Sequence, residues 1–288
     1  MSERTSSPMP TLVAGGTGKT GRRVAARLAA RGVPTRIGSR SVRPPFDWAD
    51  RTTWRPTLEG MHAAYIAYYP DVAVASSVDA IRDFAELALA AGCRRLVLVS
   101  GRGEVGAQRA EEALQASGAE WTIVRCSWFM QNFSENFFAE MLAAGELALP
   151  AGDVRAPFVD ADDIADVAVA ALTEDGHAGR VYELTGPDAL THAEAVEEIG
   201  RATGRSLRYV EISVDDFVSA LVGLGVPTEE IDLLRYLFTD VLVDANASIA
   251  FGVEQALGRA PRTFRDYARA AAATGVWQGT AVGVHTQE

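Results

Sequence analysis

A glycine-rich segment near the start of the chain restricts the possible folds more than any other feature. The apolar run 11–14 leads into residues 15–21, Gly-Gly-Thr-Gly-Lys-Thr-Gly, and a helical pattern with Val24 and Leu28 on one face follows. Glycines between a strand and a helix allow a tight turn and a close approach of the backbone to phosphate, while the helix N-terminus offers N–H groups. This order predicts the first unit of a dinucleotide-binding fold.

Two other interpretations of this loop are open. The Gly-Lys-Thr at 18–20 resembles the end of a nucleotide-triphosphate loop, but that motif needs a glycine five positions earlier, where Val13 stands. A glycine turn without a ligand is the second alternative. If the dinucleotide interpretation holds, the loop residues that contact the cofactor are Gly15, Thr17, Gly18, Lys19, Thr20 and Gly21.

The rest of the chain alternates apolar runs with helical patterns. The predicted strands cover 11–14, 34–38, 45–48, 63–70, 95–100, 121–125 and 181–184, and helices are expected at about 74–91, 107–116 and 162–172. Strands and helices alternating at this spacing predict a parallel sheet with right-handed crossovers. Residues 129–147 have the pattern of one aromatic-rich helix, and 191–276 is mostly helical with a strand near 207–212.

The predicted fold class is therefore α/β, a Rossmann doubly wound parallel sheet with a smaller, mostly helical C-terminal substrate lobe. We expect the dinucleotide-binding domain at 11–190, with 129–150 contributing to the substrate lobe, and the lobe itself at 191–278. Residues 1–10 and 279–288 lack periodicity, and we expect both ends to be flexible.

Composition and charge limit the classes of partner and the cellular location that we expect. A net charge of −11 repels nucleic-acid phosphates and anionic membrane surfaces, so neither is an expected partner. No apolar run is long enough to span a membrane, and the first ten residues have no apolar signal core, which favours the cytoplasm. The two cysteines, Cys93 and Cys126, are expected as buried thiols, and the histidines have no zinc spacing, so no metal is predicted.

The end of the second predicted strand indicates which dinucleotide binds. An NAD enzyme places an acidic residue there, whereas this chain has Ser39 and Arg40. An arginine can pair with the 2′-phosphate of NADP, so NADP(H) is the expected cofactor; the alternative is a solvated surface charge. Asp47 is interpreted either as a contact to the adenine amino group or as a turn cap.

Several segments together resemble the NmrA-like group of atypical short-chain dehydrogenases/reductases. They are residues 14–21, Arg40, and the stretches 117–125, 128–133, 157–165 and 181–186. The resemblance implies a Rossmann domain with a smaller lobe over the nicotinamide end. The group contains NADP-dependent quinone and isoflavone-type reductases, and also cofactor-binding regulators without known catalysis.

The chain departs from the wider superfamily at one catalytic element. Many members use a Tyr-x-x-x-Lys pair as proton donor and cofactor clamp. Lys19 is the only lysine of this chain and lies in the glycine loop, so no such pair exists. Three consequences are open: the acceptor needs little acid assistance, another group donates the proton, or the protein only senses the redox state of the cofactor.

Candidate chemistry follows the strand ends, because the carboxyl ends of parallel strands face the ligand crevice. Tyr68 and Tyr69 follow one strand; Tyr68 is a candidate catalytic phenol and Tyr69 a candidate cofactor contact. Ser100 matches a position that contacts nicotinamide or substrate in the relatives, and we expect it in both the catalytic and the cofactor-binding set. Glu104 is either a proton relay or a solvated loop acid.

The segment after residue 127 is rich in aromatic residues, on which a flat substrate can stack. Asn132 is the polar exception and a candidate for orienting substrate, and the alternative for the aromatic residues is ordinary core. The three aspartates at 160, 162 and 163 are expected to cap and charge a helix start. The predicted substrate contacts are Trp128, Phe129, Phe133 and Phe137.

These features predict an NADPH-dependent reductase that passes hydride directly to a quinone or another aromatic or conjugated carbonyl compound. The partner is then a small aromatic molecule, and a homodimer is possible. A non-catalytic NADP-binding redox sensor is the first alternative, and a cofactor-retaining epimerase or isomerase of a biosynthetic pathway is the second.

Overall fold

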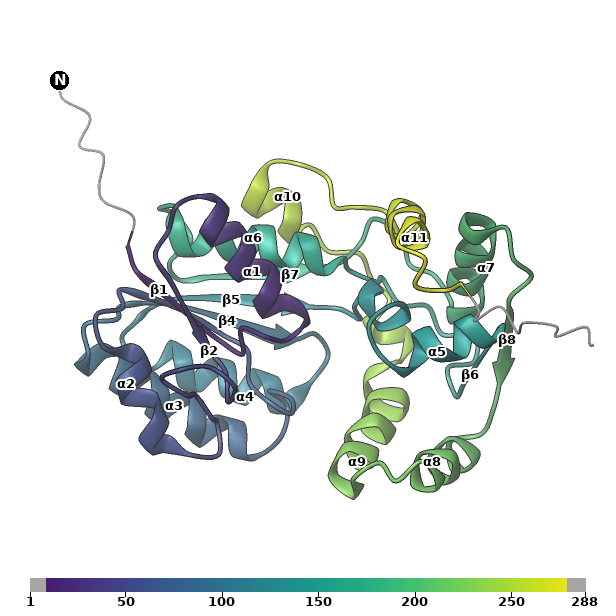
Figure 1. The fold of residues 1–288 in the computed structure, drawn as a ribbon, viewed down its shortest axis with the longest axis horizontal. Coiled ribbons are helices and arrows are strands. Elements are labelled where there is room, and N and C mark those ends of the chain that lie inside the picture. Colours follow the sequence, from purple (N-terminus) through teal and green to yellow (C-terminus); the bar gives the residue numbers. More distant parts are fainter. Residues whose placement is uncertain (1–8, 279–288) are drawn as a thin grey trace, which may run out of the picture. The chain divides into compact units, whose positions relative to one another are not determined.

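The computed structural model describes residues 9–278, which form two compact units (Figure 1). Each unit is assembled from three separate stretches of chain. The first unit contains residues 9–127, 161–185 and 250–261, and the second contains residues 128–160, 186–249 and 262–278.

A six-stranded parallel sheet forms the centre of the first unit, as predicted. Its strand order is β2-β1-β3-β4-β5-β7. The strands are β1 (Thr11–Ala14), β2 (Thr35–Gly38), β3 (Ala63–Ile66), β4 (Arg95–Gly101), β5 (Glu120–Cys126) and β7 (Arg180–Leu184). In the register, Val13 of β1 pairs with Ile37 on one side and with Tyr65 on the other. The chain order thus reverses at β1, and such a switch point opens a ligand crevice at the carboxyl ends of the strands.

Helices cover both faces of this sheet (Figure 1). One face carries α1 (Lys19–Ala30) and α6 (Ala161–Thr173), which pack on each other. The other face carries α2 (Trp54–Leu58), α3 (Ser76–Ala90) and α4 (Val105–Gln115), whose apolar residues share a core with those of β1, β3 and β4. Cys93 and Cys126 are buried free thiols, as expected.

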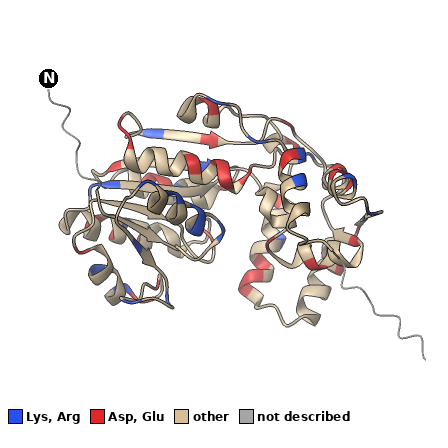
Figure 2. Cartoon of the chain, turned by 45° about the horizontal axis from the view of Figure 1, so that its top comes forward, with Lys and Arg blue, Asp and Glu red and all other residues tan. Residues whose placement is uncertain are grey.

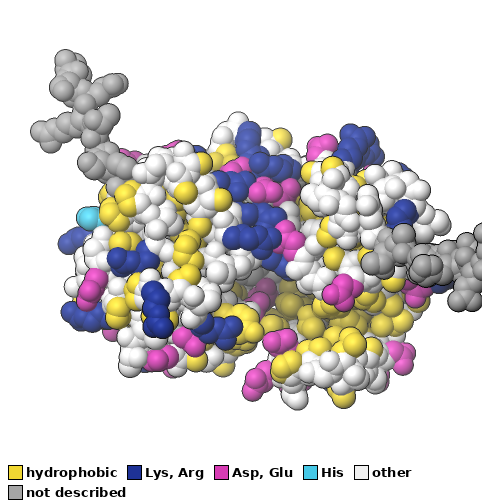
Figure 3. Space-filling view, viewed as in Figure 1, with side chains coloured by type: hydrophobic (Ala, Val, Ile, Leu, Met, Phe, Trp, Pro, Cys, Tyr) yellow, Lys and Arg dark blue, Asp and Glu magenta, His cyan; other side chains and the backbone are white. Residues whose placement is uncertain are grey.

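Ion pairs join the helices of the α1 face. Arg27 of α1 donates to Asp166 at 2.5 Å and to Asp162 at 2.7 Å, both on α6. Asp162 and Asp163 lie in the first turn of α6, as predicted, so their charges also favour the helix start. The charged residues of α1 are all basic and those of α6 are all acidic (Figure 2), and side chains of both signs are intermingled on the surface in Figure 3.

The division of the chain differs from the predicted boundary near residue 190. Residues 250–261, with α10 (Gly252–Leu257), return to the first unit, and residues 128–160 belong wholly to the second. Arg259 explains the return, because it pairs with Asp163 at 2.8 Å and with Asp166 at 2.6 Å. The expectation of flexible ends falls, for residues 1–8 and 279–288, outside the described residues.

Two predicted elements are wrong. Residues 45–48 form no strand, because the Asp47 carboxylate accepts the Ala49 N–H at 3.0 Å and turns the chain. Residues 129–147 are not one helix. They form a 3₁₀ turn, η2 (Met130–Phe133), then α5 (Phe137–Ala144) and strand β6 (Glu146–Leu149). Asn136 caps α5, and Gly145 ends it in the left-handed region at φ 104°, where glycine is favoured.

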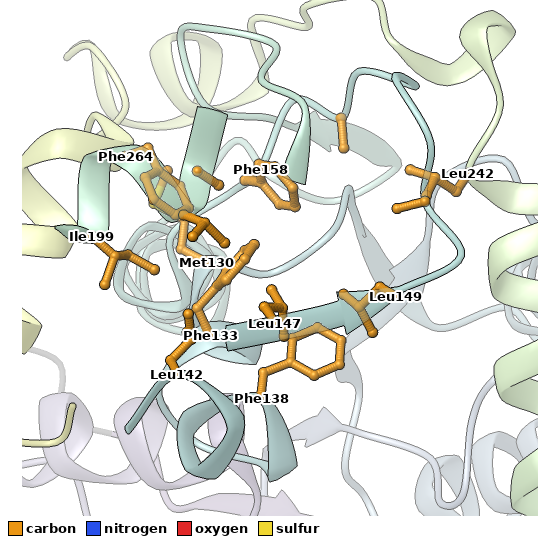
Figure 4. Close-up of a cluster of buried hydrophobic side chains, with 14 of the residues drawn as sticks. Met130, Phe133, Phe138, Leu142, Leu147, Leu149, Phe158, Ile199, Leu242 and Phe264 are labelled. Carbon is orange, nitrogen blue, oxygen red and sulfur yellow. The ribbon is translucent and has the colours of Figure 1, made fainter. Parts of the chain in front are cut away.

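The second unit is mostly helical, as predicted for the lobe, with a two-stranded parallel sheet of β6 and β8 (Arg208–Glu211). Thr191 caps α7 (His192–Thr203) reciprocally with Glu194. The core is built from aromatic and branched side chains (Figure 4). Besides η2 and α5, the helices of this unit are α7, α8 (Val214–Gly223), α9 (Thr228–Tyr236) and α11 (Phe264–Ala273), with a π-helical turn at Leu237–Val241 and a 3₁₀ turn at Asp244–Asn246.

The remaining short element, a 3₁₀ turn at Arg51–Thr53, belongs to the first unit. None of the helices in residues 9–278 is both long and apolar enough to cross a membrane.

Candidate active site

The glycine loop is packed so tightly that side chains are excluded at three positions. Gly15 has a φ of +80°, and a Cβ there would come within 2.9 Å of the Ala67 carbonyl oxygen. A Cβ on Gly16 would come within 2.9 Å of the Ile37 side chain. A Cβ on Gly21 would overlap the Gly15 carbonyl. The loop therefore brings bare backbone to the switch point between β1 and β3.

The N-terminus of α1 is built to receive an anion. Gly18 is the N-cap and supplies no side chain, and the first turn contains no acidic residue. A helix N-terminus without a side-chain cap has N–H groups and a positive dipole end directed at any neighbouring anion. Thr17, Lys19 and Thr20 lie in this turn, with Thr17 exposed and Thr20 buried. The geometry fits a pyrophosphate, and cofactor contacts of the individual loop residues stay a prediction.

Arg40 and Tyr69 meet beside the loop, although they follow different strands. The Arg40 guanidinium carbon lies 5.6 Å from the centre of the Tyr69 ring, and this ring is 58% exposed. A cation over an aromatic face is a favourable arrangement. Next to Arg40, the hydroxyls of Ser39 and Ser41 lie 3.0 Å apart. Together they offer a charge and two hydroxyls to a phosphate.

Asp47 and Tyr68 have local partners. Asp47 caps a turn, as described above, which is one of its two predicted roles; the adenine contact stays a prediction. Tyr68 packs 5.0 Å from the Trp48 ring, and its hydroxyl lies 3.3 Å from that of Ser76. These contacts hold the phenol at the carboxyl end of β3.

Ser100 is the buried end of a chain of hydrogen-bonded polar side chains. Its hydroxyl donates to Glu111 at 2.5 Å and is 4% exposed. Arg125 donates to the same carboxylate and, at 2.8 Å, to Glu183, which also accepts from Arg102. Hydrogen bonding to Glu111 raises the pKa of Arg125, so this guanidinium is charged at neutral pH. Because the Ser100 hydroxyl already donates its proton to Glu111, its oxygen can accept a hydrogen bond from a ligand but cannot donate one.

Glu104 is not the solvated loop acid that one interpretation suggested. It is 7% exposed, and its carboxyl lies against Gly101, where a Cβ would overlap it. Burial, followed by the negative charge of Asp71, raises the pKa of Glu104 to about 8. The raised pKa favours the protonated form of this carboxyl at neutral pH, and it lies two strands away from the glycine loop, since β3 separates β4 from β1.

The aromatic residues predicted to contact substrate lie in the second unit. Phe133 is fully buried among Phe158 and Phe264 and is therefore core. Trp128 and Phe137 are partly buried at the edge of that core. Substrate contact by Trp128, Phe129 and Phe137, and the orienting role of half-buried Asn132, stay predictions.

Sequence reasoning missed one unusual residue of this unit. His192 is fully buried among aromatic rings, and neither ring nitrogen has a hydrogen-bond partner. Burial lowers its pKa to about 3, so the imidazole is neutral. Its position after a helix cap gave no signal of this environment. Asp160, the third predicted capping residue, directly precedes α6 and accepts a hydrogen bond from the Gln131 amide at 2.8 Å, and its capping role stays a prediction.

No three histidine, cysteine, aspartate or glutamate side chains converge as metal ligands anywhere in residues 9–278.

Comparison with known proteins agrees with this geometry. Residues 108–268 match the model of the NmrA-like family, and residues 15–175 match an NAD(P)H-binding family. A (4-alkanoyl-5-oxo-2,5-dihydrofuran-3-yl)methyl phosphate reductase of Streptomyces griseus is 35% identical over 89% of this chain and 95% of its own. The NAD(P)H azoreductase of Xenophilus azovorans is 31% identical over 91% of this chain and 98% of its own.

The fold also has solved counterparts. One is an NADPH-dependent quinone oxidoreductase from Escherichia coli in complex with NADPH, with a TM-score of 0.71 and 23% identity. The match covers 90% of this chain and 98% of that one. At this identity, the likeness concerns the fold alone.

Proposed function

The chain belongs to the NmrA-like family, and from this membership we propose that it is an NADPH-dependent reductase of quinones or other aromatic or conjugated carbonyl compounds. It is an NAD(P)H-dependent oxidoreductase, in line with its NAD(P)H-binding domain and with relatives that are named oxidoreductases, reductases and dehydrogenases. The preference for NADPH and the class of acceptor are the parts that we add.

The pairing of Arg40 with Tyr69 beside the glycine loop carries the proposal. The loop and the uncapped end of α1 would hold the pyrophosphate, and Arg40 with the Ser39 and Ser41 hydroxyls would hold the 2′-phosphate. No acidic side chain follows β2 to grip an unphosphorylated ribose in the manner of NAD enzymes. When bound, NADPH supplies a hydride.

The acceptor class follows from what the chain lacks and from its relatives. With Lys19 as its only lysine, it has no Tyr-x-x-x-Lys pair to protonate a simple ketone. An acceptor that is already electron-poor needs less help, so positioning can supply most of the acceleration. The names of the two relatives above describe reduction of an azo compound and of an oxo-dihydrofuran phosphate, which fits acceptors of this kind.

Fluorescence titration with NADPH and NADH, followed by oxidation with a panel of quinones, tests the proposal. We expect NADPH to bind more tightly and to be consumed. Loss of a charged hydrogen bond in Arg40→Ala should weaken NADPH binding about 10- to 100-fold and leave NADH binding nearly unchanged. Arg82→Ala, an exposed arginine on α3, is the matched control and should behave as the wild type.

The other outcomes are equally informative. An unchanged NADPH/NADH ratio in Arg40→Ala would make this residue an ordinary surface charge. Tight NADPH binding without reduction of any acceptor would favour the redox sensor. Turnover that leaves the bound nicotinamide unchanged would favour the isomerase.

A further inference from the structure

Two acidic side chains lie together at the carboxyl ends of neighbouring strands in the first unit. Asp71 follows β3 and Glu104 follows β4, and these strands pair with each other in register, Ile66 opposite Leu98. Glu104 begins α4 as its N-cap residue, but its side chain caps no backbone group. Its carboxyl is instead directed back over Gly101 toward Asp71.

The surroundings of this acid pair contain no compensating positive charge. Among the described residues, the only charge that acts on Glu104 is that of Asp71, and no donor reaches the buried Glu104 Oε2 atom. Asp71 accepts the Ala73 backbone N–H at 2.8 Å. The nearest arginine along the chain, Arg102, is paired with Glu183 on β7. Two adjacent carboxylates cannot both stay charged in such a place, so one proton remains between them.

The pair also lies on the side of the crevice where chemistry is expected. The glycine loop follows β1 and Arg40 follows β2, so the phosphates and the adenosine half of a dinucleotide belong to that side of the switch point. The end of β3, where Tyr69 meets Arg40, borders this half, and the end of β4, one strand further from β1, lies toward the reactive half of the cofactor. Glu104 is thus a buried acid with an unpartnered oxygen at the reacting end of the sheet.

We propose that Asp71 and Glu104 hold one shared proton and that Glu104 gives it to the anion formed when the acceptor takes up hydride. This inference rests on the proposed function. A quinone that gains a hydride, with its two electrons, becomes a hydroquinone anion, while NADPH becomes NADP⁺. The Glu104 O–H bond then breaks, an O–H bond forms on the acceptor, and Glu104 is left as a carboxylate.

Glu104 can be protonated again without any other redox partner. Asp71 is half-buried, so it connects the Glu104 carboxylate to solvent, from which the proton returns. The raised pKa values of both carboxyls fit such a cycle, since Glu104 holds its proton up to about pH 8. The pair would supply the acid function for which this chain has no Tyr-x-x-x-Lys pair.

A comparison of two acceptors tests the proposal. A quinone needs a proton after hydride uptake, whereas a triarylmethane dye cation becomes neutral on taking hydride and needs none. We expect Glu104→Gln to slow quinone reduction about 100-fold and to leave dye reduction and NADPH binding unchanged. Glu112→Gln, an exposed residue on the same helix, should change neither rate. In the wild type, the ratio of the quinone rate to the dye rate should fall above about pH 8, which requires no variant.

A second readout is independent of turnover. Infrared spectra of the protein without acceptor should contain a protonated carboxyl band at pH 7 that disappears above about pH 8 and is missing in Glu104→Gln. The proposal is overturned if this band is absent, if Glu104→Gln keeps its quinone rate, or if it loses both rates equally. A wild type that reduces only the dye overturns it as well. A wild type that reduces neither acceptor overturns the proposed function together with this inference. The two failures can be told apart, because a failure of the proposed function is already seen in the unsubstituted protein.

Discussion

At the scale of single residues, His192 is the clearest conflict between a side chain and its surroundings. The rings of Trp128, Phe133, Phe158 and Phe238 lie 5.2–6.2 Å from the imidazole, and none of them supplies a hydrogen-bond partner. A buried polar group without partners loses its hydration and gains nothing in exchange. The second unit therefore tolerates the histidine only in its neutral form.

The pH dependence of the free energy of unfolding should reveal that His192 is buried in its neutral form. In the unfolded chain His192 titrates near 6.5, but in the fold near 3, so the unfolded state binds more protons between these values. Stability should fall as the pH drops below 6.5, and at pH 5 this one residue should cost about 2 kcal/mol relative to neutral pH. His192→Phe should remove that loss, measured as the difference in free energy of unfolding by urea at pH 7 and pH 5.

Exposed His62 provides the control. His62→Gln should keep the full loss of stability between pH 7 and pH 5. If His192→Phe shows the same loss as the wild type, the imidazole is not the group that titrates. Because the comparison uses a difference between two pH values, any packing change caused by the larger ring cancels to first order.

At the scale of elements, the join between the glycine loop and α1 determines whether phosphate can bind. Gly21 faces the Gly15 carbonyl so closely that a methyl group there would push the helix away from the loop. Gly21→Ala should therefore weaken NADPH binding about 5- to 150-fold, since overpacking of this kind costs about 1–3 kcal/mol. Fluorescence titration measures the dissociation constant.

Gly223 at the end of α8 is the matched glycine, with nothing within 4 Å of an added Cβ and no left-handed φ. Gly223→Ala should leave binding unchanged and keep or slightly raise stability, because alanine is the better helix former. Equal effects of the two substitutions would mean that the loop adapts and that its glycines are not required for binding.

At the scale of the whole molecule, each unit is completed by segments that are distant in sequence. Trp277 is the last large side chain among the described residues, and it is fully buried in the second unit. Its indole N–H donates to the Phe133 carbonyl at 2.7 Å, and its own carbonyl accepts from Arg205. The end of the described chain thus connects η2 with the segment between α7 and β8 of this unit.

Trp277→Ala should accordingly lower the free energy of unfolding by about 3–5 kcal/mol, as expected when a buried tryptophan is removed. Urea unfolding followed by circular dichroism measures the change. Phe251, an exposed aromatic residue, is the control, and Phe251→Ala should change stability by less than about 1 kcal/mol. A Trp277→Ala protein as stable as this control would show that the second unit closes without the late segment.

The sequence alone was sufficient for the features that depend on hydrophobic periodicity and on the order of glycine loop and helix. Alternating apolar runs and helical patterns predicted the parallel sheet and most of its strands, and glycines followed by a helix predicted the loop. It failed where a single cap redirects the chain. Asn136 and Gly145 break the predicted aromatic helix, and the Asp47 carboxylate turns a segment whose apolar residues indicated a strand.

Only the tertiary structure decided how the polar groups are protonated and paired. The Ser100 hydroxyl is bound by Glu111 of the next helix, and Glu104 is buried against Asp71 from a neighbouring strand end. Local sequence sets backbone conformation through sterics and capping, and these act over a few residues. Protonation depends instead on desolvation and on charges supplied by distant segments, which meet only when the sheet has formed.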